Sequence, residues 1–346
     1  NKSVFTFGNI LAEYLTNVDK KFLEKYDLLH DQCILMDKKR NNILKDMKDT
    51  YPYILNTGGS SYNTMKMIQW LSGSKTCTNY VGCVGVDALG DIITEQCENS
   101  NINVNLDRVS NKTGYCCVLI SKTNNTRSMV TYLGSSLDIC DDFMSQGVFT
   151  ESLFNSDLFY ITGYIFLFKS DILLNYAKEC FEIGIQVFYS IAAEYICQSI
   201  PEEIEQLMEY VYVVIGNRTE FHCFGRVFGI NCEFDDLLMK RIFEKLKEKY
   251  NRSIVLIMTR AEDPVIMVKP SQINTVDLYT CNTVNIQSNQ IIDTCGAGDA
   301  FAGGFIYGYL LDANDYEKCM QIGVKAAKYI LTMNSFQIQD VIPPFM

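Results

Sequence analysis

Five short, continuously apolar runs of the sequence constrain the fold more than any other feature. They are rich in β-branched and aromatic residues and occupy positions 3–8, 157–163, 185–191, 212–217 and 253–259. Continuous apolar runs of this length are typical of parallel strands that are buried on both faces. The runs therefore predict a parallel sheet covered on both sides.

Helical patterns lie between and after these runs. Residues 170–184 begin with Ser-Asp, a suitable N-terminal cap, and end at Gly184, a suitable C-terminal residue. Residues 233–250 have an acidic first turn and a basic last turn, as the helix dipole favours, and residues 314–333 form the last expected helix. Strands that alternate with helices predict an α/β fold, in which ligands bind at the carboxyl ends of the strands.

Two segments interrupt the alternation. Residues 11–57 are charged and irregular, and residues 112–136 resemble a hairpin with a turn at 122–126. We expect both segments to form a small β-rich lid over the strand ends. The remaining residues, 1–10, 58–111 and 137–346, are expected to form a large α/β domain that binds nucleotide and substrate.

Composition restricts the partners. The net charge is −11 and the isoelectric point is near 4.8, which argues against nucleic acid and anionic membranes as partners. The 14 cysteines are scattered and only two histidines are present, so we do not expect a zinc site. We expect the cysteines to be reduced thiols of a cytosolic protein. Without a signal peptide pattern or an apolar stretch long enough to span a bilayer, we expect a cytoplasmic monomer.

The stretch IIDTCGAGDAFAGGF, Ile291–Phe305, indicates an anion site. We expect a strand to end near Ile292, the chain to turn through Cys295–Gly298, and a helix to begin at about Asp299. Glycines allow close backbone approach, and the first amides of a helix favour an anion. Cys295 is the thiol whose reactivity we expect to matter.

Two other phosphate-binding motifs do not match this stretch. No lysine follows the glycines, as a Walker A loop requires, and Phe301 occupies the third glycine position of a dinucleotide fingerprint. The remaining puzzle is the acid inside the turn. Asp299 is interpreted either as a general base for a hydroxyl that attacks a phosphoryl group, or as a plain helix cap.

Three motifs together resemble the ribokinase-like carbohydrate and nucleoside kinases, the PfkB family. They are D-T-x-G-A-G-D-x-F at 293–301, the G-x-x-G-x-D-x-x-G pattern within 82–91, and the N-x-x-E pattern at 217–220. The resemblance implies a three-layer α/β sandwich with a mostly parallel central sheet and a small β-rich lid. It also implies ATP as phosphoryl donor and Mg²⁺ as cofactor.

Four further stretches resemble the adenosine kinase branch of that family, in order along nearly the whole chain. They occupy residues 7–28, 57–71, 124–130 and 159–166. This resemblance implies phosphorylation of the 5′-hydroxyl of adenosine to give AMP and ADP, a purine salvage reaction.

The resemblance assigns roles position by position. Asp299 would be the base, and Gly296, Ala297 and Gly298 the anion hole. Arg127, on the lid, would close onto the ATP phosphates. The substrate would contact a set of residues that line the sugar and base pocket: Asn9, Glu13, Gly58, Gly59, Asn63 and Tyr164. Thr259 and Asn217 would approach the nucleotide, and Asn217 and Glu220 would support Mg²⁺, largely through water.

Departures from the family pattern concentrate in the substrate pocket. Glu13 replaces an aspartate, Ile10 a proline, Ile165 an aromatic residue and Ala261 a glycine, and segment 188–196 lacks an expected asparagine and proline. Two alternatives therefore stay open: a kinase of the same family that acts on another nucleoside or on a sugar, and a catalytically weak nucleoside-binding homologue.

Each assignment also has a plainer interpretation. Asn217 and Glu220 could only cap the next helix, and Asn63 could cap the helix in which it lies. Gly58 and Gly59 could only form a tight turn. Arg127 could be a solvated hairpin charge.

Overall fold

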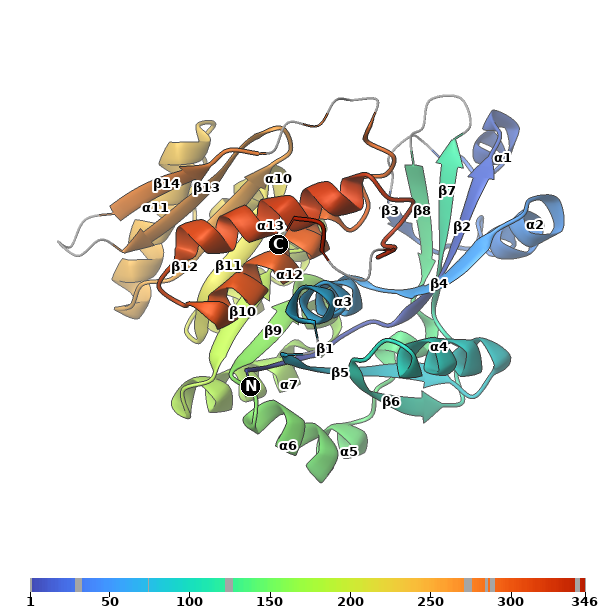
Figure 1. The fold of residues 1–346 in the computed structure, drawn as a ribbon, viewed down its shortest axis with the longest axis horizontal. Coiled ribbons are helices and arrows are strands. Elements are labelled where there is room, and N and C mark those ends of the chain that lie inside the picture. Colours follow the sequence, from blue (N-terminus) through green and yellow to red (C-terminus); the bar gives the residue numbers. More distant parts are fainter. Residues whose placement is uncertain are drawn as a thin grey trace.

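The protein folds around two β-sheets (Figure 1). The computed structural model describes residues 2–28, 33–73, 75–121, 127–270, 276–283, 286, 290–339 and 343–345. Within these residues, no helix is both long and apolar enough to cross a membrane.

The larger sheet has nine strands in the order β14-β13-β12-β11-β10-β9-β1-β5-β6. Its strands are β1 (Ser3–Phe7), β5 (Cys77–Gly85), β6 (Asn103–Val109), β9 (Leu158–Thr162), β10 (Gln186–Ser190), β11 (Val211–Asn217), β12 (Val255–Arg260), β13 (Asp263–Pro270) and β14 (Val276–Cys281). All pairings from β6 to β12 are parallel, and β13 and β14 add an antiparallel edge. The expected parallel strands are therefore confirmed.

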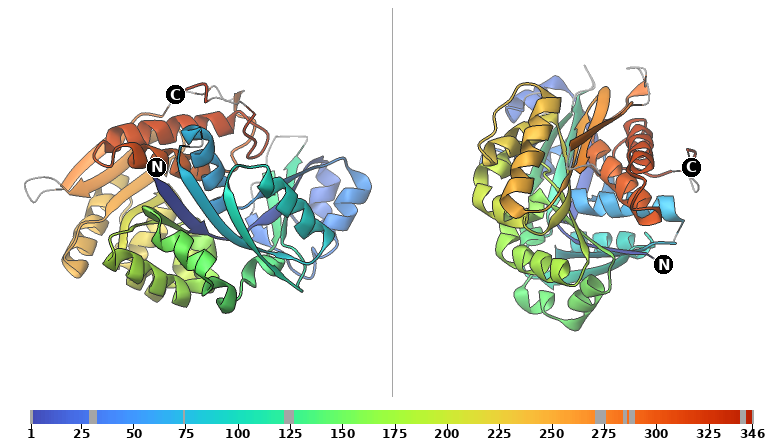
Figure 2. Two further views of the ribbon diagram at one scale, coloured as in Figure 1. Left: turned by 60° about the horizontal axis from the view of Figure 1, so that its bottom comes forward. Right: turned by 90° about the vertical axis from the view of Figure 1, so that its left-hand side faces the viewer.

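Helices cover both faces of this sheet (Figure 2, right). One face carries α3 (Ser60–Ser72), α4 (Ala88–Glu98), α12 (Ala297–Leu311) and α13 (Tyr316–Leu331). The other face carries α6 (Gly147–Phe154), α7 (Gly163–Glu182), α8 (Glu194–Ser199), α9 (Pro201–Leu207), α10 (Arg218–Val227) and α11 (Asp235–Tyr250), and the short α5 spans Asp141–Met144. The result is the predicted three-layer α/β sandwich.

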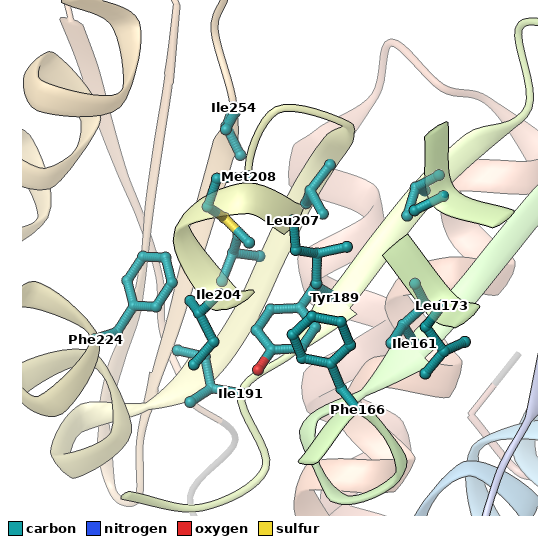
Figure 3. Packing of buried hydrophobic residues seen from close by; sticks show 14 of the residues in the cluster. Ile161, Phe166, Leu173, Tyr189, Ile191, Ile204, Leu207, Met208, Phe224 and Ile254 are labelled. Atoms are coloured by element: carbon teal, nitrogen blue, oxygen red, sulfur yellow. The ribbon is translucent and has the colours of Figure 1, made fainter. Parts of the chain in front are cut away.

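Burial of the apolar strand residues holds these layers together. On the α7–α11 face, Tyr189 of β10 lies among Phe166, Ile204 and Leu207 (Figure 3). Each of these four side chains is fully buried. Full burial of one such side chain stabilises a fold by about 1.5–3 kcal/mol, so these contacts fix the strand ends in place.

The smaller sheet has five strands in the order β3-β8-β7-β2-β4. They are β2 (Leu11–Val18), β3 (Cys33–Leu35), β4 (Ile54–Gly58), β7 (Tyr115–Ser121) and β8 (Arg127–Tyr132). Helices α1 (Lys20–Lys25) and α2 (Ile43–Thr50) lie in the same part of the chain, and the short 3₁₀ helix η1 (Gly134–Leu137) follows β8. The division into a large domain and a lid stays a prediction. The turn expected at 122–126 lies outside the described residues.

One local expectation is confirmed and another is wrong. Helix α7 spans Gly163–Glu182 with a kink at Lys169 (φ −134°, ψ 30°), so the helical segment expected from Ser170 begins directly after the kink, and a further segment from Gly163 precedes it. Residues 290–293 form no strand, and α12 begins at Ala297, two residues before the expected start at Asp299. A helix can begin earlier because Gly296 adopts a left-handed conformation (φ 73°) as its N-cap.

Candidate active site

The glycine-rich turn forms a cradle at the N-terminus of α12. Helix geometry leaves the amides of its first turn, including that of Gly298, without intrahelical acceptors. A Cβ added at Gly298 would meet nothing within 4 Å, whereas one added at Gly296 would lie 2.3 Å from the Phe336 ring. The turn is therefore closed at Gly296 and open at Gly298, where an anion can approach the free amides.

Asp299 lies in the first turn of α12 but turns its side chain toward α3. Its Oδ1 accepts a hydrogen bond from Ser60 Oγ at 2.6 Å, and its Oδ2 accepts one from Asn63 Nδ2 at 3.3 Å. Since the N-cap is Gly296 and makes no side-chain cap bond, the interpretation of Asp299 as a helix cap is wrong. The carboxylate instead lies between the anion cradle and α3.

The surroundings of Asp299 adjust its basicity. Burial raises the pKa of its carboxyl to about 6, and the charge of Glu13 acts in the same direction. The hydrogen bonds from Ser60 and Asn63 and the charge of Lys66 oppose this rise. A carboxylate with a pKa slightly below neutral is ionised at pH 7 yet basic enough to accept a proton, as a general base must.

Two buried asparagines have unused acceptors within the described residues: Asn63, which contacts Asp299, and Asn9, which lies beside Gly59. Asn9 donates from Nδ2 to the backbone oxygen and hydroxyl of Ser136, at 3.3 and 3.2 Å. The Oδ1 atoms of Asn9 and Asn63 have no hydrogen-bond partner in the part of the chain that the structure describes. Buried amide oxygens are normally paired, so these two atoms retain unused acceptor capacity.

The glycine pair at the end of β4 makes room for Glu13. A Cβ on Gly58 would fall 2.1 Å from the Glu13 carboxyl carbon, and one on Gly59 would fall 2.1 Å from the Asn9 carbonyl oxygen. The Gly59 amide donates to Glu13 Oε1 at 3.3 Å, and its φ of 110° disfavours any other residue. Gly58 and Gly59 are therefore required by close packing, and this packing holds the Glu13 carboxylate beside the turn.

Asn217 and Glu220 form a reciprocal capping box at the start of α10. Glu220 accepts hydrogen bonds from the Asn217 backbone amide at 2.8 Å and from Asn217 Nδ2 at 2.7 Å, while Asn217 Oδ1 accepts from the Glu220 amide at 2.9 Å. The capping interpretation is thus confirmed. Burial raises the pKa of Glu220 to about 7.

This box also fits a role in holding Mg²⁺ through water. Asn217 is exposed, and a carboxylate offers about four lone-pair positions, so the oxygens here retain acceptor capacity for water. Direct coordination would require the capping bonds to break. No group of three or more metal-binding side chains gathers within the described residues. Thr259, on the neighbouring strand, donates to the Gly216 carbonyl at 3.4 Å.

Arg127 of β8 forms a buried ion pair with Asp293, the first residue of the D-T-x-G-A-G-D motif. The side chains are 10% and 2% exposed, so the interpretation of Arg127 as a solvated charge is wrong. Asp293 also accepts from the Cys295 and Ser335 amides, both at 2.9 Å. The pair ties the smaller sheet to the anion cradle; contact of Arg127 with phosphate stays a prediction.

Tyr164 lies at the start of α7, and burial, with smaller contributions from the charges of Asp299 and Glu220, raises its pKa well above the usual value. Ile165 is fully buried in the core and is therefore not part of the site. Contact of Tyr164 with the substrate stays a prediction.

Several site residues were missed by sequence reasoning: Ser60, Lys66 and Asp293. Lys66 lies one helical turn after Asn63, a spacing that places both on one face of α3. That spacing could have identified it.

The expectation of a reactive Cys295 is wrong, since burial raises the pKa of this thiol well above its usual value and keeps it neutral. All 14 cysteines are free thiols.

Comparison with known proteins agrees with this geometry. Residues 20–340 match the family described as pfkB family carbohydrate kinase. The chain belongs to the pfkB family. As a pfkB kinase it is an ATP-dependent phosphotransferase with an alcohol group as acceptor.

The pfkB kinases most relevant here are adenosine kinases. Adenosine kinase 2 of Arabidopsis thaliana is 26% identical over 326 residues, covering 94% of this chain and 92% of that protein. The adenosine kinase of Dictyostelium discoideum is 27% identical over 337 residues, covering 96% of each chain. Adenosine kinase from Schistosoma mansoni in complex with 2-fluoroadenosine matches with a TM-score of 0.87 and 27% identity, covering 98% of this chain and 97% of that chain.

Proposed function

We propose that this pfkB kinase transfers the γ-phosphoryl group of ATP to the 5′-hydroxyl of adenosine, giving AMP and ADP in purine salvage. The observation that carries the proposal is the placement of Asp299. Its backbone belongs to the anion cradle, whereas its carboxylate is hydrogen-bonded to Ser60 and Asn63 of α3. A base in this position meets a hydroxyl on one side and a phosphoryl group on the other.

The residues divide the reaction between them. Asp299 accepts the proton of the attacking hydroxyl, and the amides of Ala297, Gly298 and their neighbours stabilise the charge that develops on the transferred group. The unpaired oxygens of Asn9 and Asn63 accept hydrogen bonds from the ribose hydroxyls. Glu13 lies between these groups and the Gly58–Gly59 turn.

The nucleotide side follows from the same arrangement. When bound, Mg²⁺ would neutralise charge on the ATP phosphates, and Asn217 and Glu220 would hold it through water. Thr259 lies on the strand beside them. Arg127 is already next to the cradle and reaches the phosphates by exchanging Asp293 for phosphate oxygens, since a guanidinium binds both kinds of anion.

A coupled assay of ADP release with adenosine and Mg-ATP tests the proposal. Substitution of Asp299 by Asn is expected to lower kcat by roughly 10²–10⁴-fold, because it removes general-base catalysis while keeping the shape of the side chain. Asp312→Asn, at the exposed opposite end of α12, is the matched control and should leave kcat unchanged. Near-normal turnover of D299N would contradict the role.

A second candidate is the same chemistry on another nucleoside or a sugar. The observation that favours it is Glu13, whose longer side chain fills the space beside Gly58. A substrate panel ranked by kcat/KM decides between them: adenosine leads if the proposal holds. No ADP release with any acceptor would favour a nucleoside-binding homologue.

A monomeric state, a cytoplasmic location, and the lack of nucleic-acid and membrane partners stay predictions from the sequence.

A further inference from the structure

Lys66 of α3 is a half-buried lysine that the proposed reaction has not yet used. Its ammonium donates to the Thr57 carbonyl at 3.0 Å and to the Phe336 carbonyl at 3.4 Å. It also lies over the rings of Tyr62 and Phe336, at 5.4 and 5.0 Å from their centroids. One cation therefore joins α3, the end of β4 and the segment that follows α13.

Both carbonyls belong to segments that support the site. Thr57 directly precedes Gly58 and Gly59, which pack against Glu13 and Asn9. Phe336 packs its ring against Gly296, the N-cap of the anion cradle. Because Lys66 binds the backbone of both segments, it fixes the distance between the substrate side and the phosphate side of Asp299.

Lys66 is also a counter-charge for the carboxylates of the site. Burial lowers the pKa of Lys66, and the charges of Glu13 and Asp299 oppose this decrease. The charge of Lys66 in turn favours the ionised form of Asp299. Two further carboxyl groups, Glu13 and Glu220, act with Asp299, and the charge of Lys66 opposes theirs.

We infer that Lys66 is a positioning residue of the phosphoryl transfer, which sets the cradle and the Thr57–Gly59 turn at their working separation around Asp299. The inference rests on the proposed function for its catalytic part. A plainer structural role, in which Lys66 only stabilises the fold, predicts lower stability without any effect on the ionisation of Asp299.

The test uses Lys66→Met, which keeps the apolar stem and removes the charge, and Lys66→Arg, which keeps the charge. For K66M, kcat should fall about tenfold to a hundredfold, with little change in KM for adenosine, because the reacting groups are displaced. The acidic limb of its kcat/KM profile should move up by about one pH unit, because loss of a nearby cation raises the pKa of Asp299. K66R should return the limb to the wild-type position.

Lys325→Met is the matched control, since Lys325 is an exposed lysine that also donates to a carbonyl near the C-terminus, that of Phe345, at 3.4 Å. It should move neither kcat nor the limb. A K66M enzyme that is destabilised but keeps the wild-type acidic limb would overturn the inference in favour of the structural role.

Hydrogen exchange gives a measurement that does not need activity. In K66M, amides of residues 57–59 and 295–298 should exchange about tenfold faster, whereas those of β10 serve as an internal reference. Unchanged exchange in both turns would overturn the inference. A wild-type enzyme without activity on adenosine would instead contradict the proposed function, and the exchange result would still decide the role of Lys66.

Discussion

Breaking the buried pair between Arg127 and Asp293 should reveal how strongly the smaller sheet is attached to the anion cradle. Asp293 accepts from the Arg127 guanidinium, the Cys295 amide and the Ser335 amide. In Asp293→Asn, one carboxylate oxygen becomes an NH₂ group that faces a donor, and the guanidinium loses the charge of this carboxylate. Removing one partner of a buried pair costs about 3–5 kcal/mol, so we expect this loss in the free energy of unfolding.

The complementary change should cost less. In Arg127→Met the Asp293 carboxylate keeps both amide donors, so the loss should be about 1–3 kcal/mol. The double variant should be more stable than the sum of the two losses predicts, by about 1 kcal/mol or more, because the charges are lost together.

Urea unfolding followed by fluorescence of Trp70 measures these free energies, since the single tryptophan packs against Tyr329 with ring centroids 4.6 Å apart. Arg108→Met is the control, because it breaks the exposed pair with Asp91 and should cost less than about 1 kcal/mol. The reasoning is refuted if D293N costs no more than R108M, or if the two losses at Arg127 and Asp293 simply add.

Three further predictions concern pH and backbone strain. Because Asp299 must be ionised to act and its pKa is raised to about 6, kcat/KM should be lost as the pH falls through about 6, which a pH–rate profile measures. Burial raises the folded-state pKa of Glu220 from 4.5 to about 7, so its ionisation opposes folding. The free energy of unfolding should therefore fall as the pH rises from 4.5 to 7, and Glu220→Gln should remove this part of the pH dependence in urea titrations. Ala261→Gly should raise the free energy of unfolding by about 1 kcal/mol, because Ala261 is held at a φ of 53°, where an alanine is strained and a glycine is not; no gain in a thermal melt would contradict this.

Features that depend on local sequence could be predicted. The strands of the central sheet follow from continuous apolar runs, which have few alternatives to a doubly covered sheet. The anion cradle follows from glycines next to a helix start. Helix boundaries were less certain: α7 begins at Gly163 because the helix starts directly at the strand end, where no capping pattern marks it.

Pairings between distant segments could not be predicted in the same way. Ser60 and Asp299 meet across 239 positions, and Arg127 and Asp293 across 166. Nothing in the composition of either partner indicates the other, because such contacts follow from how the two sheets and α12 pack. The same holds for Lys66, whose two carbonyl partners come from opposite ends of the chain.

The topology of the smaller sheet has a consequence for how the chain folds. Its parallel pair β2·β7 aligns Ala12 with Tyr115, and between these residues the chain returns to the central sheet through β5 and β6. Closing so long a loop is entropically costly, and β1, β5 and β6 must be in register before β7 can reach β2. The smaller sheet should therefore form late, on a core already assembled, and an excised segment 11–57 should not fold alone. A protease that cuts within this sheet would remove a part that cannot re-form independently.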